Sequence, residues 1–217
     1  MGADLGPTTR LTTLADDAPY VLGSAMGVRA VFLVGFMASG KSSVGHELAR
    51  RLGWDFVDLD TRIESRERQT VPEIFRERGE PGFRLVEAAT LRDLTESLER
   101  DTVVALGGGT FAQLKNRELL RPWPSVFLDV PLDELWRRSL EDATKRPLRK
   151  DDPTEFARLY EYRLPFYRQA SVTVVTSGKD LASLCAEIER TLQFRGGTEA
   201  EGSSPARPAH FGTGESQ

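Results

Sequence analysis

The stretch AVFLVGFMASGKS, residues 30–42, decides the fold of this chain. Its first five residues are aliphatic, β-branched or aromatic without interruption, which is typical of a strand buried on both faces. The pattern G-x-x-x-x-G-K-S follows at once, from Gly35 to Ser42. Apolar residues then recur every four positions over residues 44–52, which predicts a helix. A strand, a glycine-rich loop and a helix in this order are the context in which the motif, a P-loop, binds phosphate.

The chemistry of the loop explains its spacing. Gly35 and Gly40 let the backbone curl until several N–H groups converge on one point, beside the positive end of the next helix. Lys41 is expected to reach the β- and γ-phosphates of a nucleotide, and the Ser42 hydroxyl to ligate Mg²⁺. The alternative is a chance glycine-rich turn before a helix. The predicted nucleotide contacts in the loop are Ala38, Ser39, Gly40, Lys41, Ser42 and Ser43.

The rest of the core repeats the alternation of short apolar runs and helical patterns. Further strands are predicted at residues 55–59, 102–106, 125–130 and 172–175. A capping box at residues 70–73 starts one of the helices. Strands that are apolar on both faces and alternate with helices favour a parallel sheet covered on both sides. We therefore expect an α/β three-layer sandwich of the P-loop NTPase type, with a five-stranded parallel sheet.

Composition narrows the class of protein. Of 217 residues, 39% are hydrophobic and 29% charged, enough apolar content for a packed core. A net charge of −4 gives no general indication of a nucleic-acid or membrane partner, and one cysteine with two histidines excludes Cys-rich and multi-histidine metal sites. No apolar run spans a bilayer and no secretory signal is visible, so we expect a cytoplasmic protein. We expect residues 1–28 and 195–217 to be flexible tails on either side of one domain, residues 29–194.

Two short motifs place charge near the loop, and each has an ordinary alternative. Asp58 and Asp60 close the second predicted strand, where residues two apart share a face; a solvated strand end with a helix cap is the simpler interpretation of this motif alone. Arg84 and Glu87 share a face of a helix. Glu87 can hold Arg84 with its fork left to grip an anion, but a surface ion pair is the simpler interpretation of this motif alone.

Three further segments follow. Gly107-Gly108-Gly109 after the third strand allows the backbone to approach a ligand closely, or is a flexible turn. Arg146 lies in the charged segment 141–153, a candidate mobile lid or an ordinary surface loop. Arg163 is expected at the end of a helix, because Pro165 disfavours helical geometry just before it.

Taken together and in order, these segments resemble one family. The P-loop, Asp-x-Asp, Phe-Arg-x-x-Glu, Gly-Gly-Gly, Arg-Pro-Leu and Arg-x-Pro-x-Tyr occur in the order found in shikimate kinases, over residues 31–192. The resemblance implies a nucleoside-monophosphate-kinase-like fold with a lid. It also implies transfer of the ATP γ-phosphate to the 3-hydroxyl of shikimate, with Mg²⁺, on the route to chorismate and the aromatic amino acids.

The resemblance also implies a role for each residue of the motifs. Lys41, Asp60 and Arg146 are the expected catalytic residues, Asp60 orienting the substrate hydroxyl and Arg146 neutralising the transferring phosphoryl group. Ser42 and Asp58 would hold Mg²⁺, and Arg138 and Arg146 would join the nucleotide site. The expected shikimate contacts are Asp60, Arg84, Gly107, Gly108, Gly109, Arg163, Phe75, Phe83 and Glu87.

The expected partners are shikimate and ATP, with no nucleic acid and no membrane, and one chain completes the pocket, so a monomer is expected. A gluconate- or nucleoside-monophosphate-kinase relative is an alternative, but Arg84, Gly108 and Arg163 suit a carboxylate-bearing acid. A non-catalytic ligand sensor is a second alternative, and such a domain should lack Lys41, Asp60 or Arg146.

Overall fold

The computed structural model describes residues 29–141 and 152–192. The two predicted tails, the lid residue Arg146 and the predicted domain end at 194 lie outside these ranges. The elements in chain order are β1 (Ala30–Val34), α1 (Lys41–Leu52), β2 (Asp55–Asp58), α2 (Leu59–Glu67), α3 (Val71–Glu96), β3 (Thr102–Ala105), the short 3₁₀ helix η1 (Thr110–Ala112), α4 (Leu114–Leu120), β4 (Ser125–Asp129), α5 (Leu132–Glu141), α6 (Pro153–Tyr167), β5 (Val172–Val175) and α7 (Leu181–Thr191).

The five strands form one parallel sheet in the order β2-β3-β1-β4-β5. β1 lies at its centre, with Phe32 opposite Val104 of β3 and Ser125 of β4. Every residue of β1 is buried, because helices cover both faces. The predicted three-layer α/β sandwich with a five-stranded parallel sheet is confirmed.

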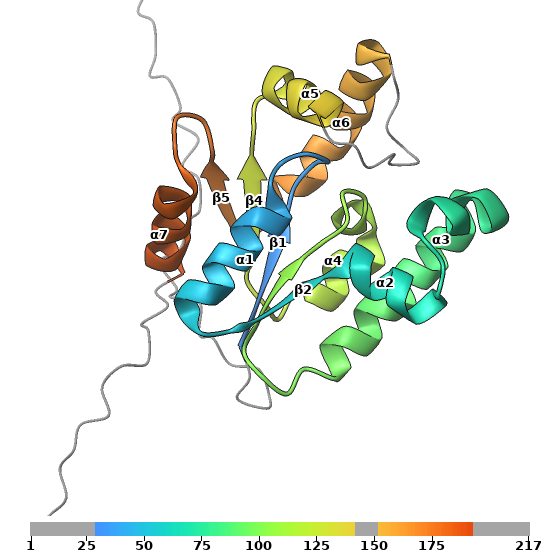
Figure 1. The fold of residues 1–217 in the computed structure, drawn as a ribbon, viewed down its shortest axis with the longest axis horizontal. Coiled ribbons are helices and arrows are strands. Elements are labelled where there is room, and N and C mark those ends of the chain that lie inside the picture. Colours follow the sequence, from blue (N-terminus) through green and yellow to red (C-terminus); the bar gives the residue numbers. More distant parts are fainter. Residues whose placement is uncertain (1–28, 142–151, 193–217) are drawn as a thin grey trace, which may run out of the picture.

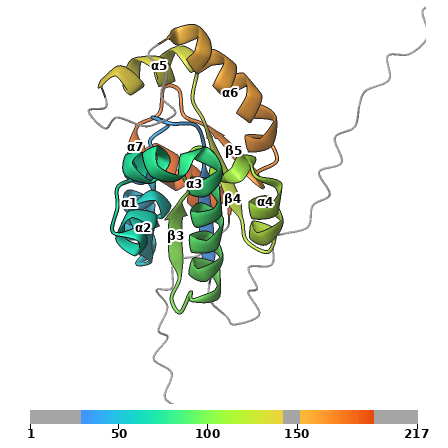
Figure 2. The same cartoon turned by 90° about the vertical axis from the view of Figure 1, so that its right-hand side faces the viewer.

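Alternate residues of β1 pack into two separate layers. Val31 and Leu33 join a cluster with α1 and α7, whereas Phe32 and Val34 join the larger cluster with α3 and α6. Figure 1 shows α1 and α7 on one side of the sheet, α2 and α3 on the other, and α5 and α6 beyond the strand ends. In the turned view, α3 stands in front of the strands, with α5 and α6 above (Figure 2). No helix within residues 29–141 or 152–192 has the length and apolarity to cross a membrane.

Two helices differ from the sequence prediction. The capping box at Thr70 and Glu73 is present, but α3 is interrupted at Gly79, whose φ of 65° and ψ of −179° are not helical. α6 does not stop before Pro165 as predicted; it continues to Tyr167. Tyr167 is completely buried, and the burial of a large aromatic side chain offsets the backbone hydrogen bond that a proline removes.

Candidate active site

The P-loop closes around the side chain of Lys41. Gly40 and Ala38 take positive φ angles of 85° and 61°, which turn the backbone tightly before α1 begins. The Lys41 ammonium donates to the carbonyl oxygens of Gly35 at 3.0 Å and Phe36 at 2.8 Å. Lys41 is only 7% exposed. The loop therefore places one cation at the N-terminus of a 12-residue helix, where partial positive charge already favours an anion.

The structure brings together the two residues predicted to hold a metal. The Ser42 hydroxyl donates to Asp58 Oδ2 at 2.7 Å. Asp58 Oδ1 accepts from the backbone nitrogen atoms of Asp60 at 3.0 Å and Thr61 at 3.4 Å, and so caps α2. The strand geometry predicted for Asp60 is wrong: β2 ends at Asp58, and Asp60 lies in the first turn of a helix. This helix start, and not strand alternation, puts both carboxylates at the same cavity.

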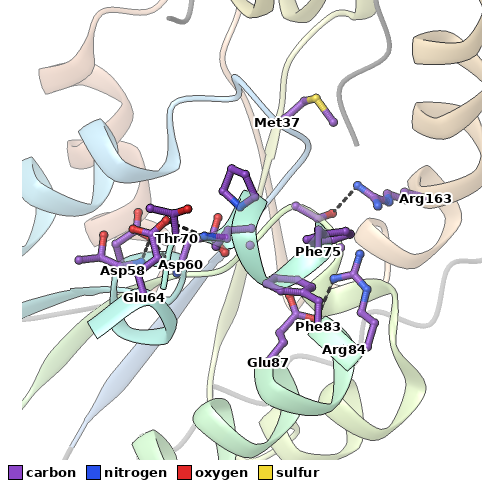
Figure 3. Close-up of a pocket in the computed structure, with 16 residues that line it drawn as sticks. Met37, Asp58, Asp60, Glu64, Thr70, Phe75, Phe83, Arg84, Glu87 and Arg163 are labelled. Atoms are coloured by element: carbon purple, nitrogen blue, oxygen red, sulfur yellow. Dashed lines mark hydrogen bonds and ion pairs between the residues drawn. The ribbon is translucent and has the colours of Figure 1, made fainter. Parts of the chain in front are cut away.

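One cavity of about 480 Å³ adjoins these residues, at the end of the sheet where the P-loop lies. Figure 3 shows Asp58 and Asp60 on one side of it and Arg84 and Arg163 on the other. Its size suits a small organic ligand. The lining residues are Met37, Asp58, Asp60, Thr61, Glu64, Thr70, Val71, Pro72, Phe75, Phe83, Arg84, Glu87, Gly107, Gly108, Gly109 and Arg163.

Arg84 lies between two carboxylates. Its Nη1 donates to Glu87 at 2.8 Å, as predicted, but its Nε and Nη2 donate to Glu80 Oε1 at 3.3 and 3.0 Å. The prediction of an open fork is therefore wrong, because Glu80 lies one helical turn before Arg84 and reaches its outer edge. Burial lowers the pKa of Arg84, but Glu87 and Glu80 outweigh this effect, and the pKa of Arg84 lies above its ordinary value.

Glu87 is buried with a polar partner on each side. Its side chain is 1% exposed, and its second oxygen accepts from the Thr110 hydroxyl at 2.6 Å. A Cβ built on Gly107 would lie 2.8 Å from Asp60 Oδ1 and 3.2 Å from Glu87 Oε1. The absence of a side chain at Gly107 thus lets the Asp60 and Glu87 carboxylates approach the same backbone.

The second glycine of the triplet is braced by α6. Arg163 Nη1 donates to the Gly108 carbonyl at 3.3 Å, and the Tyr167 hydroxyl donates to the same oxygen. Arg163 is 4% exposed, so the ordinary helix-end cation considered from the sequence is not what the structure shows. Within residues 29–141 and 152–192, no carboxylate forms an ion pair with Arg163, which distinguishes it from Arg84.

The remaining predicted site residues are two phenylalanines of the cavity and Arg138 beside the P-loop. The rings of Phe75 and Phe83 lie 4.4 Å apart between centroids and form an apolar wall of the cavity. Arg138 pairs with Glu134 at 2.5 Å, and its Nη1 would lie 3.9 Å from a Cβ on Gly40. Arg138 therefore lies beside the P-loop and outside the cavity that Arg84 and Arg163 line.

Three residues whose side chains contact Arg84, Glu87 or Gly108 were not assigned to the site from the sequence, although Tyr167 ends the Arg-x-Pro-x-Tyr motif. Glu80 could have been found from its spacing, four residues before Arg84 on one helix. Tyr167 likewise lies four residues from Arg163, on the same helix. Thr110 gave no comparable signal, because its contact with Glu87 joins two segments that are distant in the sequence.

Comparison with known proteins agrees with this geometry. Residues 37–193 match the family model described as shikimate kinase. The chain belongs to the shikimate kinase family. A shikimate kinase from Parasynechococcus marenigrum is 40% identical over 73% of this chain and 83% of its own. One from Geobacter metallireducens is 40% identical over 82% of this chain and 99% of its own.

A solved structure gives the same relationship in three dimensions. The shikimate kinase from Acinetobacter baumannii in complex with shikimate superposes with a TM-score of 0.71 at 33% identity. The match covers 77% of this chain and 94% of that one. The five-stranded parallel sheet described above is thus the fold of a shikimate kinase.

Proposed function

We propose that this protein transfers the γ-phosphoryl group of ATP to the 3-hydroxyl of shikimate, giving shikimate 3-phosphate and ADP. One observation carries the proposal: a single cavity joins a carboxylate pair beside the P-loop to the partly buried Arg84 and the buried Arg163 at its far wall. Shikimate is a small carboxylic acid with several hydroxyl groups. Family membership supports this acceptor over gluconate or a nucleoside monophosphate.

The acid end of the cavity supports recognition of a carboxylate. Arg84 and Arg163 both line the cavity, and Arg163 donates to the backbone carbonyl of Gly108. A guanidinium can bind a carboxylate with two parallel hydrogen bonds. We infer that these two arginines bind the carboxylate of shikimate while Phe75 and Phe83 pack against its ring.

The opposite end supports activation of the hydroxyl. Asp60 lies between the cavity and the P-loop side, with its carboxylate against Gly107. A carboxylate in that position can accept the hydrogen bond of a substrate hydroxyl and orient its oxygen for in-line attack. We assign this role to Asp60, and the stabilisation of charge on the phosphoryl oxygens to Lys41. Arg146, the proposed lid residue, lies outside the described residues.

The residues beside the P-loop fit Mg²⁺. Ser42 and Asp58 offer a hydroxyl and a carboxylate oxygen 2.7 Å apart, and Mg²⁺ prefers oxygen ligands. Within the described ranges no cluster of three or more His, Cys, Asp or Glu residues could hold a metal ion. Mg²⁺ usually keeps several waters and binds through one or two protein oxygens and the substrate phosphates, so Ser42 and Asp58 would be sufficient as its protein contacts. When bound, Mg²⁺ would neutralise phosphate charge.

The test is release of ADP by the purified protein with ATP, Mg²⁺ and one acceptor at a time. We expect release that depends on shikimate, and little with gluconate or AMP. Phosphorus NMR of the product should place the phosphate on the 3-oxygen. If shikimate does not stimulate ADP release, the proposed function is wrong. The predicted monomer and cytoplasmic location are separate proposals, which sedimentation and cell fractionation would test.

A further inference from the structure

The guanidinium of Arg84 has two carboxylate partners of different character. Glu87 accepts from Nη1, while one oxygen of Glu80 accepts from Nε and Nη2 together. The Nε–Nη2 edge is a geometry by which arginine binds a carboxylate in two parallel bonds. An internal carboxylate therefore already occupies an edge of Arg84 that a bound acid would use.

Burial separates the two glutamates. The Glu87 side chain is 1% exposed and also accepts from Thr110, whereas the Glu80 side chain is 50% exposed and has Arg84 as its hydrogen-bond partner. Removing Glu87 from Arg84 would leave a buried charge unpaired, which is costly. Glu80 can instead turn into water, because an exposed ion pair contributes little free energy.

The backbone explains why Glu80 lies where it does. Gly79 takes a φ of 65° and breaks α3, so that Glu80 begins the second helical segment. Glu80 is then one turn before Arg84 on the same face, the spacing at which a glutamate contacts a following cation. The break lies at the rim of the cavity, since Phe83 and Arg84 line it but Glu80 does not.

We propose that Glu80 competes with the substrate carboxylate for Arg84 and thereby determines specificity. A ligand with a carboxylate replaces Glu80 on the Nε–Nη2 edge and keeps Arg84 paired. A neutral polyol gives Arg84 no such replacement and leaves the internal pair in place. The inference rests on the proposed function, because it concerns the acid-binding end of the same cavity.

The competition makes an unusual prediction: neutralising a residue at the site should improve substrate binding. In Glu80→Gln we expect the KM for shikimate to fall about two- to fivefold, the range that an exposed ion pair supports. The KM for ATP should not change, and kcat should change less than the KM. A residue that only supports the fold or orients Arg84 would raise the KM instead.

Glu77→Gln is the matched control. Glu77 is another exposed glutamate of α3 and pairs with Gln69 and Arg76 rather than with Arg84. The Glu77→Gln substitution removes the same charge as Glu80→Gln and should leave the KM for shikimate unchanged. If Glu77→Gln lowers the KM as much as Glu80→Gln, the effect is general electrostatics and the proposal is overturned.

The methyl ester of shikimate tests the role of the carboxylate, as an inhibitor competing with shikimate. The Ki of the ester should be the same in Glu80→Gln and in the wild type, or too high to measure in both. If the Ki of the ester falls in Glu80→Gln as much as the KM for shikimate does, the proposal is overturned. Turnover of shikimate by the wild type is measured first. With that turnover present, an unchanged or raised KM in Glu80→Gln overturns this inference alone. Absence of wild-type turnover contradicts the proposed function, and this inference falls with it.

Discussion

The phosphate end and the acid end of the active site hold their cations in different ways. At the phosphate end, Lys41 is bonded to carbonyl oxygens of its own loop. At the acid end, Arg84 and Arg163 come from two different helices, α3 and α6, and meet at the glycine triplet that follows β3. The first site is built by a short local sequence, whereas the second exists only when distant segments fold together.

This difference predicts two kinds of kinetic effect from substitutions at the site. Changes at Lys41 or Asp60 remove groups that act on the reacting atoms, so kcat should fall while ligands still bind. Changes at the acid end remove groups that bind the non-reacting part of the substrate. They should raise the KM for shikimate and leave the KM for ATP alone.

The largest effect is expected from Asp60→Asn, at the boundary between the two ends. The amide keeps the size of the side chain but cannot take a proton, so kcat should fall about 10²- to 10⁴-fold. ATP affinity, measured by calorimetry, should remain that of the wild type. Asp93→Asn, which changes an exposed carboxylate paired with Arg66, is the control and should be active. Near-normal turnover of Asp60→Asn would contradict the assigned role.

Lys41→Ala tests the phosphate end by itself. Removal of a cation aimed at the transferring phosphoryl group should lower kcat about 10²- to 10³-fold. Shikimate affinity without ATP should be unchanged in calorimetry, because Lys41 does not line the shikimate cavity. Lys115→Ala, at an exposed position of α4, provides the comparison. A large loss of shikimate affinity in Lys41→Ala would show that the two ends are not independent.

The same difference explains which parts of the site could be predicted from the sequence. The P-loop and the buried β1 were readable because loop glycines and strand apolarity act over a few residues. The meeting of Arg84, Arg163 and Gly108 was expected only through the family resemblance. The helical start at Asp60 was missed because its cap comes from Asp58, a residue that the pattern assigned to the strand. Glu80 was missed as a partner of Arg84 although its helical spacing was visible.

Arg84→Ala tests the acid end. Charge-assisted hydrogen bonds contribute about 1.5–3 kcal/mol each, so the KM for shikimate should rise roughly 10- to 100-fold. The KM for ATP should stay the same. The variant also leaves Glu87 buried without its cation, and urea unfolding should show a loss of about 3 kcal/mol. Arg84→Lys keeps the charge and should restore most of the stability but less of the affinity, since an ammonium lacks the planar fork.

A KM for shikimate that is unchanged in a folded Arg84→Ala protein would place the substrate carboxylate elsewhere. Arg163 would then be its only arginine partner among the residues described for the cavity. The comparison of the two arginines is therefore testable in one assay series. Arg163→Ala should raise the KM at least as much, because no carboxylate within residues 29–141 and 152–192 pairs with Arg163 and has to be displaced on binding.

The smallest of these losses is expected from Tyr167→Phe, which removes one of the two donors to the Gly108 carbonyl. One net hydrogen bond contributes about 0.5–1.5 kcal/mol, so the KM for shikimate should rise roughly two- to tenfold through the displaced glycine. Burial raises the pKa of Tyr167 above its ordinary value. The hydroxyl therefore keeps its proton, and its contribution to stability is fully present below about pH 10 and is lost only at higher pH. The ratio of variant to wild-type KM should consequently be constant from pH 6 to about 9. A ratio that varied over this range would show that another titrating group positions Gly108.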